Sequence, residues 1–181
     1  IGTLTCSGST LFVPISNVGT VRKYSTSGEH LGQVGSFGSK TGFLNFPVAV
    51  EVSDQGLILV LDRPRFCVVC YSPDGKFIGE FGGKGISPGW FMGPSLLSIP
   101  SADRAVVGQV FRNKIQVCRI PEIIRNQVDR DAPEQTALGV VPQRRSSQIS
   151  RPIHPSDGEF PSSDFNSAIS AQNVSLPEVS E

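Results

Sequence analysis

The stretches VRKYSTSGEHLGQVG at residues 21–35 and VVCYSPDGKFIGEFG at residues 68–82 are two copies of one pattern, displaced by 47 residues. The pairs that match at this displacement, without a gap, are Val21 and Val68, Tyr24 and Tyr71, Gly28 and Gly75, Gly32 and Gly79, Gly35 and Gly82, Pro47 and Pro94, and Arg65 and Arg112. An ungapped period of this length, built from short β-like segments and glycine turns, indicates a repeat architecture.

Each copy is predicted to form four short antiparallel strands. In the complete copy the expected strands are residues 47–52, 57–61, 66–71 and 76–81. Four antiparallel strands in a unit of roughly 40–50 residues form the blade of a β-propeller. We therefore predict an all-β fold, a partial β-propeller. Its blades are expected at about residues 9–35, 43–82 and 90–118, with only the last three strands of the first copy and the first three of the last.

The repeated pattern V-x-x-Y-S-x-x-G, followed by G-x-x-x-x-P-x-x-V and G-x-x-x-V-x-D, resembles the NHL repeat, with its best match over residues 43–82. The third copy departs from this pattern where Gln109 replaces Asp62. The resemblance implies that residues 1–120 are the C-terminal portion of an NHL propeller, a fold that commonly has six blades. It also implies a parent of the TRIM-NHL or RING-NHL kind, in which such propellers accompany ubiquitin-ligase or RNA-regulating modules.

The last copy has no recognisable fourth strand after Val117 and Cys118. The resemblance implies that a strand from the beginning of the domain completes this blade; the alternative is a diverged strand within residues 122–128. Residues 121–181 are rich in Ser, Pro, Gln, Asn and acidic residues and poor in large aliphatics. Such a segment cannot bury enough apolar area to offset its ordering entropy. We predict a disordered tail here, with a short helical turn within residues 120–128.

The composition limits the class of protein. The 181-residue chain has equal numbers of acidic and basic residues, and cations prevail before the tail and anions within it. No apolar run approaches the roughly 20 residues that span a bilayer, and no leader pattern precedes the repeats. The chain begins with Ile1, so we expect a fragment. Four cysteines do not suggest a disulfide scaffold. The expected location is cytoplasmic, without a membrane partner.

Catalytic and metal chemistry find little support in the sequence. Cys67 and Cys70 form a C-x-x-C, but it lies inside a predicted strand, where positions i and i+3 point to opposite faces. His30 is expected on an outer strand and His154 in the tail, away from any central metal site. We predict no catalytic residue, no metal ligand and no cofactor in this chain.

The predicted propeller has one end that gathers polar and aromatic loops, because alternate strand connections emerge at the same end. The residues expected to form a ligand-binding surface there are Lys40, Phe43, Arg63, Arg65, Lys84, Trp90 and Arg112. Arginine with exposed aromatics suits protein hot spots and single-stranded RNA. Leu44 and Phe91, each three residues before a proline, are expected to pack between blades instead.

These observations favour a non-catalytic recognition scaffold. The first hypothesis is the propeller part of a RING/TRIM-type E3 ubiquitin ligase, which binds a substrate protein or adaptor on its loop end. The alternative is a propeller that binds single-stranded RNA for post-transcriptional regulation. A third hypothesis is part of a metal-dependent propeller lyase, whose ligands would have to come from other blades. In the tail, Ser147 follows two arginines and is a candidate phosphorylation site.

Overall fold

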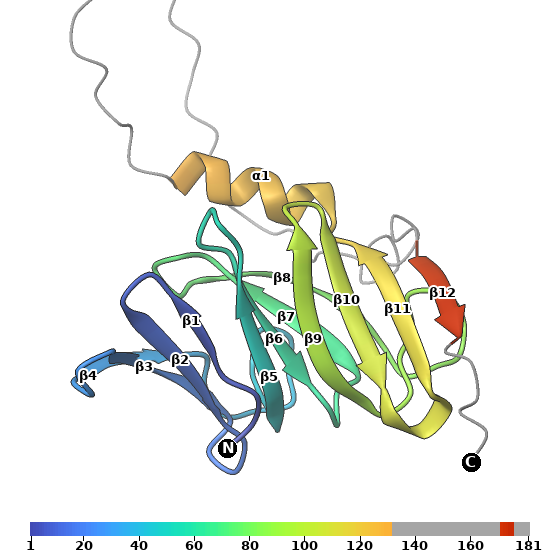
Figure 1. Ribbon diagram of the computed structural model, residues 1–181, viewed down its shortest axis with the longest axis horizontal. Coiled ribbons are helices and arrows are strands. Elements are labelled where there is room, and N and C mark those ends of the chain that lie inside the picture. The colour runs from blue at the N-terminus through green and yellow to red at the C-terminus, as the bar shows by residue number, and fades with distance from the viewer. Residues whose placement is uncertain (132–170, 176–181) are drawn as a thin grey trace, which may run out of the picture.

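The computed structural model describes residues 1–131 and 171–175, which form three antiparallel sheets and one helix (Figure 1). The first sheet contains β1 (Thr5–Ser7), β2 (Thr10–Ile15), β3 (Thr20–Ser25) and β4 (His30–Val34). The second contains β5 (Pro47–Val52), β6 (Ile58–Asp62), β7 (Cys67–Tyr71) and β8 (Phe77–Gly82). The third contains β9 (Pro94–Ser101), β10 (Arg104–Gln109), β11 (Lys114–Arg119) and β12 (Ala171–Ser175), with the 3-10 turn η1 (Val110–Arg112) between β10 and β11.

The first sheet has one strand more than the sequence predicted. β1 pairs with β2 in antiparallel register from Thr5↔Phe12 to Ser7↔Thr10. The segment before it continues onto the second sheet through a parallel bridge between Thr3 and Ala49. The first copy of the repeat therefore starts before residue 9. It was missed because β1 is only three residues long and lacks the apolar alternation of the later copies.

The third sheet is completed from the region that we expected to be disordered. β12 pairs with β11, and the helix α1 (Glu122–Asp131) follows the third sheet directly. At these two segments the expectation of a disordered tail from residue 121 is not met, although a helical turn was expected within residues 120–128. Neither proposed source of the missing strand applies to the described residues, because β12 comes from the C-terminal side. The remainder of the predicted tail lies outside the described residues.

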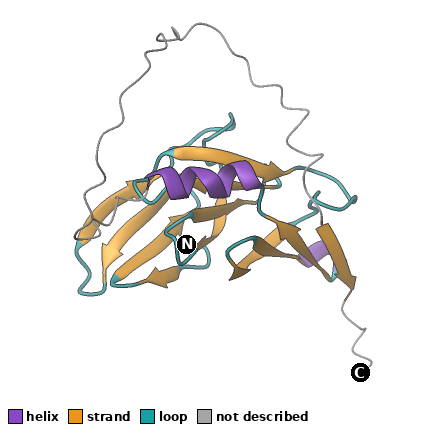
Figure 2. Cartoon of the chain, turned by 90° about the horizontal axis from the view of Figure 1, so that it is seen from above, coloured by secondary structure: helices purple, strands orange, loops and turns teal. Residues whose placement is uncertain are grey.

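The three sheets stack face to face, and the second is buried on both faces (Figure 2). Between the first and second sheets lies a cluster that includes Phe12, Val21 and Val60. Between the second and third lies a cluster that includes Leu59 and Val107. Ile124 of α1 joins this second cluster, and α1 lies across one end of the sheets (Figure 1).

The prediction of a mainly β fold built from repeated four-stranded sheets is confirmed. The described sheets do not close into a ring, so the partial propeller stays a prediction. The only α-helix of the described residues is α1, which at ten residues is far too short to cross a bilayer.

Candidate binding surface

Two loops link the sheets at the end opposite α1. The first crossover loop (residues 36–46) leads from β4 to β5, and the second (residues 83–93) from β8 to β9. Each folds back through one parallel bridge, Phe37↔Leu44 in the first and Lys84↔Phe91 in the second.

Leu44 and Phe91 anchor the two crossover loops between the sheets. Both side chains are fully buried, each in one of the two inter-sheet clusters. This confirms their expected packing role. Gly35 and Gly82 make room for them, because a Cβ at either position would lie 2.5 Å from the side chain of Leu44 or Phe91.

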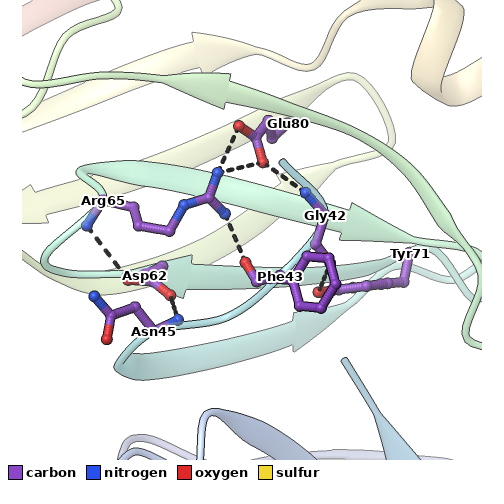
Figure 3. Close-up of polar contacts among 7 residues, drawn as sticks. All are labelled: Gly42, Phe43, Asn45, Asp62, Arg65, Tyr71 and Glu80. Carbon is purple, nitrogen blue, oxygen red and sulfur yellow. Dashed lines mark hydrogen bonds and ion pairs between the residues drawn. The ribbon is translucent and has the colours of Figure 1, made fainter. Parts of the chain in front are cut away.

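The first crossover loop is held by charged side chains of the second sheet (Figure 3). Asp62 accepts hydrogen bonds from the backbone N–H groups of Asn45 at 2.5 Å and Phe46 at 3.2 Å. Burial raises the pKa of Asp62, while these N–H donors, that of Arg65 and the charge of Arg65 act in the opposite direction. The buried carboxylate therefore acts as a fixed acceptor for the loop backbone.

Arg65 and Glu80 form the second part of this clasp (Figure 3). The Arg65 guanidinium donates to both Glu80 carboxylate oxygens, at 2.7 and 2.8 Å, and to the Phe43 carbonyl at 2.6 Å. Glu80 accepts the Gly42 N–H at 3.2 Å, and the Tyr71 hydroxyl donates to the Gly42 carbonyl at 3.0 Å. Because the Arg65 side chain is only 11% exposed, it is engaged within the protein rather than presented to a ligand.

Two glutamines hold the second crossover loop. The side-chain oxygen of Gln109 accepts the Met92 N–H at 2.7 Å. Gln116 accepts the Gly89 N–H at 2.9 Å and donates to the Trp90 carbonyl at 2.7 Å. The Gln109 amide nitrogen is buried without a hydrogen-bond partner among the described residues. The third sheet thus replaces the charged clasp with neutral amides.

A hollow of about 610 Å³ opens near the starts of β5 and β9, at the same end of the sheets. Its lining residues are Ile1, Gly2, Thr3, Ser16, Asn17, Phe46, Val48, Arg63 and Ser95. None of them carries a side-chain carboxylate, and Arg63 is exposed. The hollow therefore combines a cation, short polar groups and an exposed phenylalanine, Phe46.

Arg63 is held at the hollow by the next sheet. Its Nε donates to the Pro94 carbonyl at 3.2 Å. The Ser16 hydroxyl makes the corresponding bond to the Pro47 carbonyl at 2.7 Å. Both donors and both acceptors are related by the 47-residue displacement, so this contact belongs to the repeat. Only Arg63 adds a charge at this position.

The predicted surface residues therefore differ in their surroundings. Lys40 and Phe43 are exposed on the first crossover loop. Lys84 is exposed, with its ammonium 5.7 Å from the centre of the Phe66 ring. Trp90 is half-buried, with its ring against the backbone of Gly83. The backbone of Arg112 lies in η1, and Ser147 falls outside the described residues.

The sequence did not identify several residues that shape this end. Ser16, Asn17, Phe46 and Ser95 line the hollow, and Glu80 neutralises Arg65. The relation of Ser16 to Arg63 at the repeat displacement was a usable signal for the first of these. The Arg65–Glu80 pair was harder to find, because Arg65 lies in the loop between β6 and β7 while Glu80 lies in β8, and the third copy has no equivalent carboxylate.

The cysteines of the C-x-x-C diverge as the strand parity predicted. Cys67 belongs to the cluster shared with the first sheet and Cys70 to the cluster shared with the third. Burial raises the pKa of Cys67 to about 12 and that of Cys70 well above its ordinary value. Among the described residues, no group of three or more His, Cys, Asp or Glu side chains could hold a metal ion.

No family model matches this chain, and the search of curated proteins found no match. One solved structure with a similar arrangement is that of a Bacteroides fragilis protein described as a candidate exported protein. The two share 19% identity with a TM-score of 0.48, over 60% of this chain and 29% of the other. The chain therefore spans less than a third of the length of that protein.

Proposed function

We propose that this chain is a set of consecutive blades of an NHL-type β-propeller and acts as a non-catalytic recognition scaffold. Its ligand is a protein, bound at the loop end around Arg63. The resemblance to TRIM-NHL and RING-NHL proteins supports a parent that is an E3 ubiquitin ligase, for which this scaffold would select the substrate or an adaptor. A cytoplasmic location follows from that parent and belongs to the same proposal.

The observation that carries this proposal is the carboxylate-free hollow beside Arg63. Three positions related by the 47-residue displacement, Ile1, Val48 and Ser95, line it together. Arginine and aromatic residues are enriched among the hot-spot residues of protein interfaces. Here Nε is anchored on Pro94, and Phe46 supplies an exposed apolar surface.

RNA binding is favoured less by the same geometry. Single-stranded RNA is held by a row of cations together with aromatic rings on which bases stack. Arg65 is neutralised by Glu80, and the Trp90 ring packs on backbone. Lys40, Arg63 and Lys84 are the predicted cations that are exposed.

The test is affinity capture with the full chain, comparing Arg63→Ala with Arg104→Ala. Arg104 begins β10 at the opposite end, where its side chain is 43% exposed, so it is a matched control for loss of a surface arginine. We expect a set of proteins that Arg63→Ala loses by at least tenfold and Arg104→Ala retains, insensitive to ribonuclease. Binding that is equal in the two variants would contradict the proposed site.

A second measurement separates RNA from protein. Fluorescence anisotropy with a labelled single-stranded RNA, at low and physiological salt, reports phosphate contacts through the salt dependence of the affinity. The protein-recognition proposal predicts only weak binding that disappears at physiological salt and is unchanged by Arg63→Ala. Tight binding that Arg63→Ala weakens would support the RNA function instead.

A further inference from the structure

The outer strand of the third sheet reaches its place by a different route from the other outer strands. β4 and β8 follow β3 and β7 after tight turns, whereas residues 120–170 separate β11 from β12. β12 nevertheless pairs with β11 in continuous register, from Lys114↔Ser175 to Cys118↔Ala171 (Figure 1). Because no tight turn ties it to the sheet, β12 can leave this edge without unfolding a hairpin.

The sequence of β12 repeats the pattern of the other outer strands. At equivalent register positions the three outer strands read Gly32-Gln33-Val34, Gly79-Glu80-Phe81 and Gln172-Asn173-Val174. The last residue of each lies opposite Val21, Val68 or Ile115, which are related by the 47-residue displacement. Val34 and Phe81 are buried core residues. All three outer strands therefore carry a polar residue followed by an apolar one at these positions.

The edge that β12 covers suits an extended peptide. A sheet edge offers a row of backbone N–H and C=O groups that pair with any added strand, while alternate side chains provide selectivity. Along β11, Ile115 and Val117 are half-buried, and Gln116 is fixed by its bonds to the second crossover loop. The Gln116 side chain is thus oriented by the second crossover loop rather than by β12.

We propose that the outer edge of β11 is a docking site for an extended segment of a partner protein, with a polar residue opposite Gln116 and an apolar residue opposite Ile115. β12 occupies this site when the partner is absent. A segment of the same chain pairs intramolecularly, so its effective concentration does not depend on the protein concentration. Exchange with a second copy at micromolar concentration is therefore suppressed, and only a segment that fits better than β12 displaces it.

The test uses the full chain and a fluorescein-labelled peptide of residues 168–178 as the probe. Val174→Pro removes a backbone donor from β12 and disfavours its pairing, which frees the edge. We expect the Val174→Pro chain to bind the probe at least tenfold more tightly than the wild-type chain, as measured by anisotropy. A probe that carries the same proline is expected not to bind either chain.

A reversible disulfide between β11 and β12 serves as the control for probe binding. In a Cys6→Ser background, Lys114→Cys with Ser175→Cys places two thiols at a paired position of β11 and β12. The oxidised chain is expected to lose probe binding and to regain it on reduction. Equal affinity of wild-type and Val174→Pro chains, failure of the disulfide to form, or a wild-type dimer that Val174→Pro dissociates would each overturn the proposal, the last in favour of a second copy as the occupant.

Discussion

The two crossover loops present the same backbone groups to the sheets that hold them, yet charged side chains hold the first loop and neutral amides hold the second. Glu80 accepts the N–H of Gly42 where Gln116 accepts that of Gly89. Arg65 donates to the carbonyl of Phe43 where Gln116 donates to that of Trp90. Asp62 and Gln109 accept the N–H groups of Asn45 and Met92. Each pair of backbone groups is related by the 47-residue displacement.

The repeat therefore preserves the backbone geometry of the two crossover loops, while different side chains satisfy the hydrogen bonds of each loop. Each crossover loop, together with the side chains that hold it, is called a joint. A loop that crosses between packed sheets buries N–H and C=O groups that must find partners. At the first joint an ion pair provides one donor and one acceptor. At the second joint one glutamine provides both, since a side-chain amide carries each kind of group. A substitution at one joint therefore leaves the other joint as an internal control.

The largest effect is expected from Arg65→Ala. The change leaves the Glu80 carboxylate, 24% exposed, without its cation and the Phe43 carbonyl without its donor. Removing one partner of a buried pair costs 3–5 kcal/mol, and partial exposure here places the loss at about 3 kcal/mol. Urea unfolding of the full chain measures it, with Arg104→Ala as the control. A loss below about 0.5 kcal/mol would show that the clasp is dispensable.

Gln116→Leu tests the second joint and is expected to cost about 2 kcal/mol, because it leaves the Gly89 N–H and the Trp90 carbonyl without partners. Leucine has a side chain of similar size, so the loss of stability reports the missing hydrogen bonds rather than a cavity. The double change with Arg65→Ala is expected to be additive in urea unfolding, since the joints share no partner. Strong non-additivity would contradict independent joints.

At Asp62 the acceptor and the charge have opposite effects. Asp62→Ala is expected to cost about 1–2 kcal/mol through the unpaired N–H groups of Asn45 and Phe46, partly offset by removal of a buried charge. Asp62→Asn retains a side-chain oxygen and is expected to cost less stability than Asp62→Ala. In the third sheet Gln109, also an amide, accepts the equivalent N–H of Met92.

The pH dependence of Asp62→Asn checks the sign of this effect. Because burial raises the pKa of Asp62 in the folded state, ionisation of this group lowers stability as the pH rises through the folded pKa. The cost is absent below the ordinary pKa of 3.8. The stability of Asp62→Asn relative to wild type is therefore expected to be higher at pH 7 than at pH 3. The reverse trend in urea unfolding at the two pH values would contradict a raised pKa.

The smallest effect is expected from Lys84→Ala. An exposed cation–π contact such as that with Phe66 is worth about 0.5–1 kcal/mol at most. Thermal unfolding should therefore change little, in contrast with Arg65→Ala, although both residues were predicted from sequence to form one surface. A loss as large as that of Arg65→Ala would mean that Lys84 also belongs to a joint.

The strands of the second sheet could be predicted from sequence because its apolar alternation and turns are strong. β5 was predicted at its observed bounds, and Leu44 and Phe91 were correctly assigned to packing. β12 could not be predicted, because five residues of weak β propensity far from the repeat become a strand only through pairing with β11.

The candidate site was harder to predict than the fold. Sequence alone groups Arg63 with Arg65 because they are neighbours on one loop. Their difference arises from tertiary partners, Pro94 for the first and Glu80 for the second. Charge alone does not reveal whether a cation faces a ligand or a buried carboxylate, so only Arg63 emerges as a cation that lines the hollow.

Amide hydrogen exchange at Gly42 and Gly89 measures whether the two crossover loops are held by separate sets of side chains. We expect Arg65→Ala combined with Glu80→Ala to deprotect the Gly42 amide at least tenfold and to leave that of Gly89 unchanged. Gln116→Leu should produce the opposite pattern. If either change deprotects both amides equally, or neither amide responds, the two loops are not held by separate and equivalent joints.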